Sequence, residues 1–234
     1  MKINLRNYGN ELAHWIRAFE PFVEHAFKPA LPRLQAVLER GQDASPEKFE
    51  WDLKEPIATI VADSYDKRGG KSHKVRLYWQ FESIFRRGAE TRRKNIWTVA
   101  KMVTQIQVRD ATTDDRLLHF HVDMKNLGQL GPHIHLQLSE EYMADKVGSP
   151  IAVPRFPFAT VLPTDCLDFV LSEFFPTKWP KSQSEAHGLK ILQTAQRKRL
   201  TNMAEAIAGL WEKPSKQTPV SITQDYHMPD FEIA

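Results

Sequence analysis

The sequence predicts an α+β fold, with helices at the N-terminus, a mainly antiparallel sheet of about five strands in the middle and helices at the C-terminus. Apolar residues recur at helical spacing near both ends of the chain, whereas polar and apolar residues alternate in several runs between residues 55 and 137. Short segments rich in Gly, Pro, Asp and Thr separate these runs, as expected for turns between antiparallel strands. The length of 234 residues is sufficient for one large domain, which we place at residues 1–211.

Helical spacing is clear in the N-terminal part of the chain. Residues 11–27 carry apolar side chains at intervals of three and four, and Pro21 should kink or divide the helix that they predict. A second, shorter helix fits residues 31–40, because Pro32 falls in its first turn and Gly41 follows its last residue.

The alternating runs predict strands at residues 55–63, 74–82 and 95–109, followed by two strands that contain histidines. In the run 95–109 the even positions are expected to face the core, and the later odd positions are polar. The expected core positions of this strand are Ile96, Ala100, Met102, Ile106 and Val108.

The C-terminal part returns to helical spacing. Residues 151–163 contain three prolines and are expected to run extended along the body, outside the centre of the sheet. Thr164 or Asp165 should cap a helix that continues to about residue 175, and residues 184–211 predict a longer helix with Arg197-Lys-Arg199 on its solvated face. From residue 212 the chain is polar and contains prolines, so we expect 212–234 to be a loose tail or an arm laid on a partner.

The composition is that of an ordinary globular protein, 41% hydrophobic and 26% charged. Its apolar runs are much shorter than a membrane-spanning helix requires, so we expect no contact with a membrane interior. The N-terminus shows no apolar signal sequence, and the single cysteine, Cys166, rules out an intrachain disulfide framework. A reducing compartment, the cytoplasm of a bacterium, is the simplest expectation.

Basic residues are concentrated between Lys67 and Lys94, where ten Lys and Arg stand against two acids in a chain whose net charge is +3. Such an excess is typical either of a surface that meets phosphate or an acidic partner, or of two solvated loops that flank a strand. Our candidate contacts to phosphate or nucleic acid are Lys67, Arg68, Lys71, Lys74, Arg86, Arg87, Arg92, Arg93, Lys94 and, outside this window, Arg109 and Arg155.

The most informative motif is a pair of histidine-rich stretches at residues 119–123 and 133–137, separated by a short link that contains Gly and Pro. Each alternates polar with apolar residues, which predicts two half-buried strands joined as a hairpin. An antiparallel register that keeps the apolar residues together must place the polar ones on the opposite face. These polar residues are His119, His121, Asp123, His133, His135 and Gln137.

The preceding strand constrains the same register. If Val108 pairs near Leu118, then Gln107 lies beside His119 and Gln105 beside His121. The polar face should then continue through Lys101, Gln105, Gln107 and Arg109, while the other face packs on helices.

One interpretation of this face is a metal site. Two His-x-His pairs on neighbouring strands can place three or four imidazoles around one ion, which zinc and iron sites require. Such a site would hold zinc or another divalent metal and serve a hydrolase, with Asp123 as a further ligand or as a group that orients one. The candidate ligands are His119, His121, Asp123, His133 and His135.

A second interpretation comes from a resemblance. The run His133-Ile-His-Leu-Gln-Leu138 resembles the pattern of the histidine-triad superfamily, in the branch with glutamine at the third polar place. That resemblance implies nucleotidyl or phosphoryl transfer, with His135 as the nucleophile and Gln137 as a phosphate contact. His133 and His121 are the other candidate catalytic residues. Ser139 departs from the apolar residue that the pattern has at its end.

A third interpretation is a non-catalytic interaction protein. A His-x-His strand, a Pro-Arg-x-Pro segment and a helix that ends in Phe-Phe-Pro-x-x-Trp together resemble an uncharacterised family of bacterial phage-defence gene clusters. The residues are His133, His135, Pro154, Arg155, Pro157, Phe174, Phe175, Pro176 and Trp179. With the basic window and the polar tail, this resemblance implies an accessory subunit that binds other protein subunits in an assembly acting on nucleic acid or nucleotides. It is our leading hypothesis.

Overall fold

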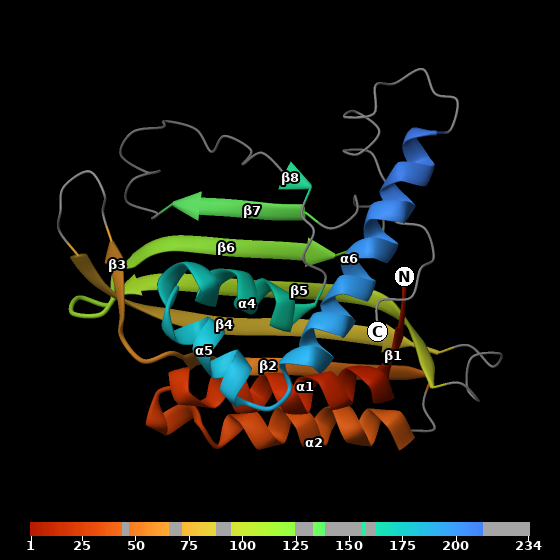
Figure 1. Cartoon of the computed structure of the whole chain (residues 1–234), viewed down its shortest axis with the longest axis horizontal. Helices are drawn as coiled ribbons and strands as arrows, with labels where there is room; N and C mark the ends of the chain where they lie inside the picture. Colours follow the sequence, from red (N-terminus) through yellow and green to blue (C-terminus); the bar gives the residue numbers. More distant parts are fainter. Residues whose placement is uncertain are drawn as a thin grey trace.

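The computed structural model describes residues 1–43, 47–65, 72–87, 95–124, 133–138, 156–157 and 162–212. It confirms the α+β architecture, with helices at both ends of the chain and an antiparallel sheet between them (Figure 1). The helices are α1 (Leu5–Phe19), α2 (Ala30–Asp43), α4 (Pro163–Phe174), α5 (Lys178–Glu185) and α6 (Leu189–Trp211). The strands are β1 (Lys2–Asn4), β2 (Lys48–Ala58), β3 (Ala62–Tyr65), β4 (Ser72–Arg86), β5 (Ile96–Asp110), β6 (Arg116–Met124), β7 (His133–Leu138) and β8 (Phe156–Pro157).

The strands form one sheet in the order β2-β4-β5-β6-β7-β8, while β1 pairs with β5 and β3 pairs with β4. All of these pairings are antiparallel. The described residues contribute eight strands, more than the five expected, because β1, β3 and β8 have only three, four and two residues. Strands this short cannot display an alternating pattern.

The helices gather on one face of the sheet, where strand β4 supplies the centre of the core. Its odd positions, including Trp79 and Phe81, are buried, as the alternation predicts. Trp79 lies against Trp15 of α1, with ring centroids 5.4 Å apart, and Trp15 in turn contacts Trp179 of α5. In Figure 1, α4, α5 and α6 lie in front of the strands, and α1 and α2 run along the edge near β2.

The core face of β5 changes in the middle of the strand, which corrects part of the expectation. Met102, Ile106 and Val108 are buried as expected, but Ile96 and Ala100 are not among the buried residues; Trp97 and Val99 are buried there instead. The reason is a register irregularity against β4, where Ile84 pairs with Lys101 and Phe85 with Val99. One extra residue in a strand exchanges its two faces.

The first long strand also begins earlier than expected. We expected a strand at 55–63, whereas β2 covers 48–58 and β3 begins at 62. Residues 48–54 alternate charged with apolar side chains, and their buried members, Trp51 and Leu53, pair with β4. The register shifts between Leu53 and Ile57, around Pro56, which cannot donate a backbone hydrogen bond.

Helix α1 begins at Leu5 rather than at residue 11. The side chain of Asn4 accepts hydrogen bonds from the backbone N–H groups of Arg6 and Asn7, at 3.1 and 3.2 Å, and so caps its N-terminus. The helix ends at Phe19, and Pro21 lies in the 3-10 turn that follows, which confirms that this proline divides the run.

The predicted helix 184–211 is in fact two helices. Helix α5 occupies 178–185, and α6 begins at 189 after a break in which His187 has a φ of 52°. Gly188 also packs closely on α1, because a Cβ on it would lie only 2.5 Å from Nδ1 of His14. A side chain at residue 188 would therefore push the start of α6 away from α1.

Helix α4 ends within a residue of its expected position, but it begins two or three residues earlier than expected because its capping residue differs. Leu162 occupies the N-cap position, and the carboxylate of Asp165 accepts a hydrogen bond from the Leu162 N–H at 3.3 Å. The extended segment is described only at β8, which pairs with the first two residues of β7 at the margin of the sheet. The rest of 151–161 and the tail from residue 213 lie outside the described residues. No helix in the described part of the chain has the length and apolar character needed to cross a membrane.

Replacement of Trp15 by Ala should destabilise the protein by about 3–5 kcal/mol, because it leaves a cavity where α1, α5 and β4 meet. Chemical denaturation measures this free energy of unfolding. Trp211→Ala is the matched control, since Trp211 is 50% exposed and its loss should have a much smaller effect. Equal losses for the two variants would contradict the arrangement of the core.

Candidate functional site

Strands β6 and β7 carry the two histidine motifs, and they pair as the sequence predicts. His119 stands opposite Gln137, His121 opposite His135, and Asp123 opposite His133. Positions paired in register share a face, so these six positions lie on one face of the sheet. The side chains of residues 133–138 are outside the described part, so β7 enters the site through its backbone register.

Strand β5 extends the same face. Gln105 pairs with His121 and Gln107 with His119, which confirms the predicted register. Lys101, farther along β5, donates to Glu82 of β4 at 2.6 Å across this face. The strands β4 to β7 therefore form a polar face that lies opposite the helical core.

The three described side chains of the β6 motif lie close together. The rings of His119 and His121 are parallel, with centroids 5.8 Å apart and planes inclined by 5°. Nε2 of His121 lies 3.1 Å from Oδ1 of Asp123. His119 and Asp123 are 7% and 8% exposed, while the side chain of His121 retains 25% exposure. A carboxylate at this distance can orient the imidazole of a metal ligand.

Arg109 forms a second group on the polar face. Its guanidinium lies over the ring of Tyr78, 5.0 Å from the centroid, and donates to Gln107 at 2.7 and 3.0 Å and to Asp114 at 2.9 Å. The hydroxyl of Tyr78 donates to the same Asp114. A guanidinium has five donor hydrogens in a planar fork, so a group held in this way can also donate to an anionic ligand.

The basic window does not form one compact patch. Strand β4 lies in its middle, and its 15 residues span about 50 Å. Lys74 is at one end, paired with Asp63, whereas Arg86 and Arg87 are at the other end, with Arg87 over the ring of Trp97 at 4.5 Å. The remaining candidates, Lys67, Arg68, Lys71, Arg92, Arg93, Lys94 and Arg155, lie outside the described residues.

The metal hypothesis concerns five residues, of which His119, His121 and Asp123 have described side chains. Among all described side chains, no group of three or more His, Cys, Asp or Glu is arranged to hold a metal ion. The other two candidates, His133 and His135, stand in register opposite Asp123 and His121. The metal site therefore remains a prediction, and it requires His133 and His135 of β7 as well as the residues of β6.

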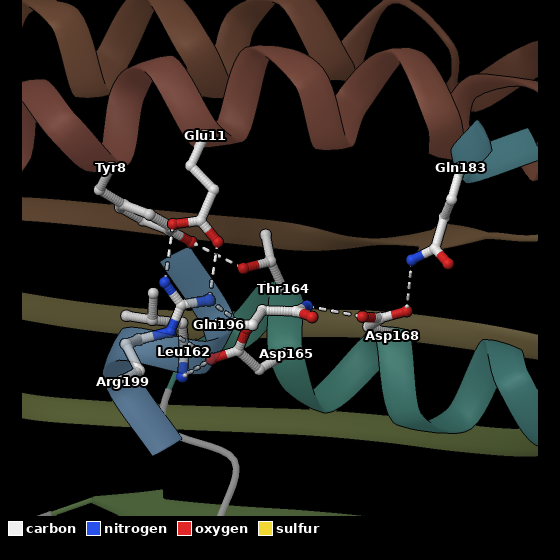
Figure 2. Close-up of polar contacts among 9 residues, drawn as sticks. All are labelled: Tyr8, Glu11, Leu162, Thr164, Asp165, Asp168, Gln183, Gln196 and Arg199. Carbon is white, nitrogen blue, oxygen red and sulfur yellow. Dashed lines mark hydrogen bonds and ion pairs between the residues drawn. The ribbon is translucent and has the colours of Figure 1, made fainter. Parts of the chain in front are cut away.

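A buried ion network ties three helices together on the opposite side of the molecule (Figure 2). Arg199 of α6 donates through its two terminal nitrogens to the two carboxylate oxygens of Glu11 on α1, both at 2.7 Å. The same guanidinium donates to Asp165 of α4 at 2.5 and 2.9 Å. Arg199 is 1% exposed, so its expected place on a solvated face was wrong.

The spacing of α6 explains this error. Arg199 follows the buried Leu192 by seven residues and precedes the buried Met203 by four, which places it on the inward stripe of the helix. A basic cluster suggested solvent, but helical periodicity was the better signal. Glu11 likewise occupies a buried position of α1, one residue before Leu12.

Neighbouring polar groups complete the network. Asp168, one turn beyond Asp165 on α4, accepts hydrogen bonds from Gln196 at 2.6 Å, from Gln183 at 3.0 Å and from the indole of Trp179. The hydroxyls of Tyr8 and Thr164 lie 3.3 Å apart beside the ion pair. Burial raises the pKa of Tyr8 well above its ordinary value, and it also raises the pKa of Glu11 against the opposing charge of Arg199.

Replacement of Arg199 by Met should destabilise the protein by about 3–5 kcal/mol, because two carboxylates remain buried without their cation. The control is Arg197→Met, which removes the same charge from an exposed position two residues away. Urea denaturation should show a large decrease in stability for Arg199→Met and a small one for the control. Similar values for both would mean that the network contributes little to the fold.

The pH dependence of the free energy of unfolding should reveal the raised pKa of Asp168. Burial, followed by the charge of Asp165, raises the pKa of the Asp168 carboxyl in the folded protein despite three hydrogen-bond donors. The folded state thus keeps this proton to higher pH, and stability should fall as pH rises from about 4 through the raised pKa. Asp168→Asn should remove this part of the slope, whereas Glu173→Gln on the same helix should not. Identical slopes for wild type and Asp168→Asn would refute the shift.

Comparison of the chain with protein-family models, with curated proteins and with solved structures found no match. We therefore infer a function from the polar face of the sheet.

Proposed function

We propose that this protein is a cytoplasmic accessory subunit of a bacterial assembly that acts on nucleic acid or nucleotides, and that the polar face of its sheet binds the phosphate-bearing component. The observation that carries the proposal is the arrangement of Arg109 and the histidine pair on adjacent strands of one face. The resemblance to bacterial phage-defence proteins supports the setting in an assembly with other protein subunits.

The chemistry of this face suits a nucleotide ligand. The guanidinium of Arg109 supplies a planar donor for phosphate, and the ring of Tyr78 packs against it. The side chain of His121 keeps 25% exposure and supplies an imidazole ring and a further donor on β6, while the buried His119 lies parallel to it. Sheets that bind single-stranded nucleic acid combine such rings with basic groups on an exposed face.

A direct test is the binding of a fluorescein-labelled single-stranded RNA and of the equivalent DNA to the full chain at several salt concentrations. Affinity should fall as salt rises, because each neutralised phosphate releases counterions. Arg109→Gln should weaken binding about tenfold and reduce the salt dependence by about one phosphate.

Arg33→Gln is the matched control for this test, because Arg33 is exposed on α2, away from the polar face. It should bind as wild type does. Binding by wild type that does not respond to salt, or equal affinities for Arg109→Gln and Arg33→Gln, would overturn the proposal.

The second candidate function is an enzyme, either a metal-dependent hydrolase or a nucleotidyl or phosphoryl transferase with His135 as nucleophile. The contact between His121 and Asp123 favours it, since a carboxylate that orients an imidazole is a common feature of metal sites and of general bases. Zinc or another divalent metal is the cofactor that the hydrolase would use.

Plasma mass spectrometry of the purified protein and assays with labelled nucleotides separate the two functions. The enzyme predicts near-stoichiometric metal that is lost in His121→Ala and His135→Ala, or a labelled covalent adduct that is lost in His135→Ala. The binding subunit predicts neither of these, together with ligand binding that depends on Arg109.

A further inference from the structure

Helices α1 and α6 enclose a groove of about 460 Å³ on the helical side of the molecule, away from the polar face of the sheet. This volume lies within the usual range of small-molecule sites, about 300–1,000 Å³. The groove is lined from α1 by Asn7, Asn10 and Glu11, and from α6 by Lys190, Ile191, Thr194, Ala195 and Lys198.

The floor of the groove is fixed by the buried ion network. Glu11 is 3% exposed, and both of its carboxylate oxygens accept hydrogen bonds from Arg199 (Figure 2). The same guanidinium binds Asp165 of α4, so α1 and α6 are held at a set distance on either side of the groove. A site of this kind exists before a ligand arrives, which reduces the ordering cost of binding.

The walls combine apolar surface with positive charge. Ile191 and Ala195 are one helical turn apart, and Ile191 is a large apolar residue with 44% exposure. Lys190 and Lys198 are both exposed and lie about 12 Å apart along the helix axis. The triad of Glu11, Asp165 and Arg199 carries one negative charge in excess, and Lys190 and Lys198 bring two positive charges to the groove. The amides of Asn7 and Asn10 supply hydrogen-bonding groups on the facing helix.

We infer that the groove between α1 and α6 binds a small organic anion, whose apolar or aromatic body lies on Ile191 and Ala195 and whose carboxylate or phosphate is bound by Lys190 or Lys198. This site is separate from the polar face of the sheet and does not depend on its function. A nucleoside monophosphate and a fatty acid share this chemistry, and the experiment distinguishes them.

The probe is 8-anilinonaphthalene-1-sulfonate, which joins an aromatic body to one anionic group and fluoresces when bound. Titration of the full-length protein should show saturable binding that is displaced by adenosine 5′-monophosphate, if the natural ligand is a nucleotide, or by octanoate, if it is a fatty acid. Ala195→Phe fills the groove, and the double variant Lys190→Gln/Lys198→Gln removes its charge. Each should weaken binding of the dye about tenfold or more.

The control is the double variant Arg33→Gln/Lys178→Gln, which removes two exposed charges elsewhere and should bind the dye as wild type does. Melting temperatures confirm that the variants fold; the lysine variant tests the inference even if Ala195→Phe does not fold. Unchanged dye binding in the lysine variant would overturn the inference. Failure of both adenosine 5′-monophosphate and octanoate to displace the dye would overturn it as well.

Discussion

The guanidinium of Arg199 is the contact on which the arrangement of the helices depends. It joins α6 to α1 through Glu11, 188 residues away in sequence, and to α4 through Asp165. A buried arginine needs partners for its charge and for its donors, and here two carboxylates supply both. Because the guanidinium fork is planar and rigid, it also restricts the rotation and depth of α6 against its neighbours.

The sheet then separates two chemical environments. Its core face carries aromatic residues of β2 and β4 against α1, which stabilise the fold without chemistry of their own. Its other face carries the amides of β5, the imidazoles of β6 and Arg109, which reaches Tyr78 and Asp114. A strand alternates its side chains with a period of two, so a single register determines both faces together. Stability and candidate function are thus fixed by the same pairings.

Local patterns in the sequence predicted those pairings well. Alternation fixed the parity between neighbouring strands, and with the assumed pairing of Val108 near Leu118 it placed Gln107 beside His119 and Gln105 beside His121. The α+β class and the presence of α4 were predicted from the local spacing of apolar residues in the same way. The ion network was not predicted, since it joins residues far apart in the chain and nothing local marks Glu11 and Arg199 as partners. The break at Gly188 was also missed, although a glycine within a helical run is a local signal for the end of a helix.

The irregularity in β5 has a consequence for sequence change in this region. The positions that face the core change from odd to even numbers at residue 100. Trp97 and Val99 are buried before it, and Met102 is buried after it. With one residue fewer at this point, Trp97, Val99 and Met102 would follow one continuous alternation and could all face the core without the irregularity. Strand β1 pairs with residues 96–98, where the odd positions of β5 face the core. The histidine strand β6 pairs from residue 102 onward, where the even positions do so.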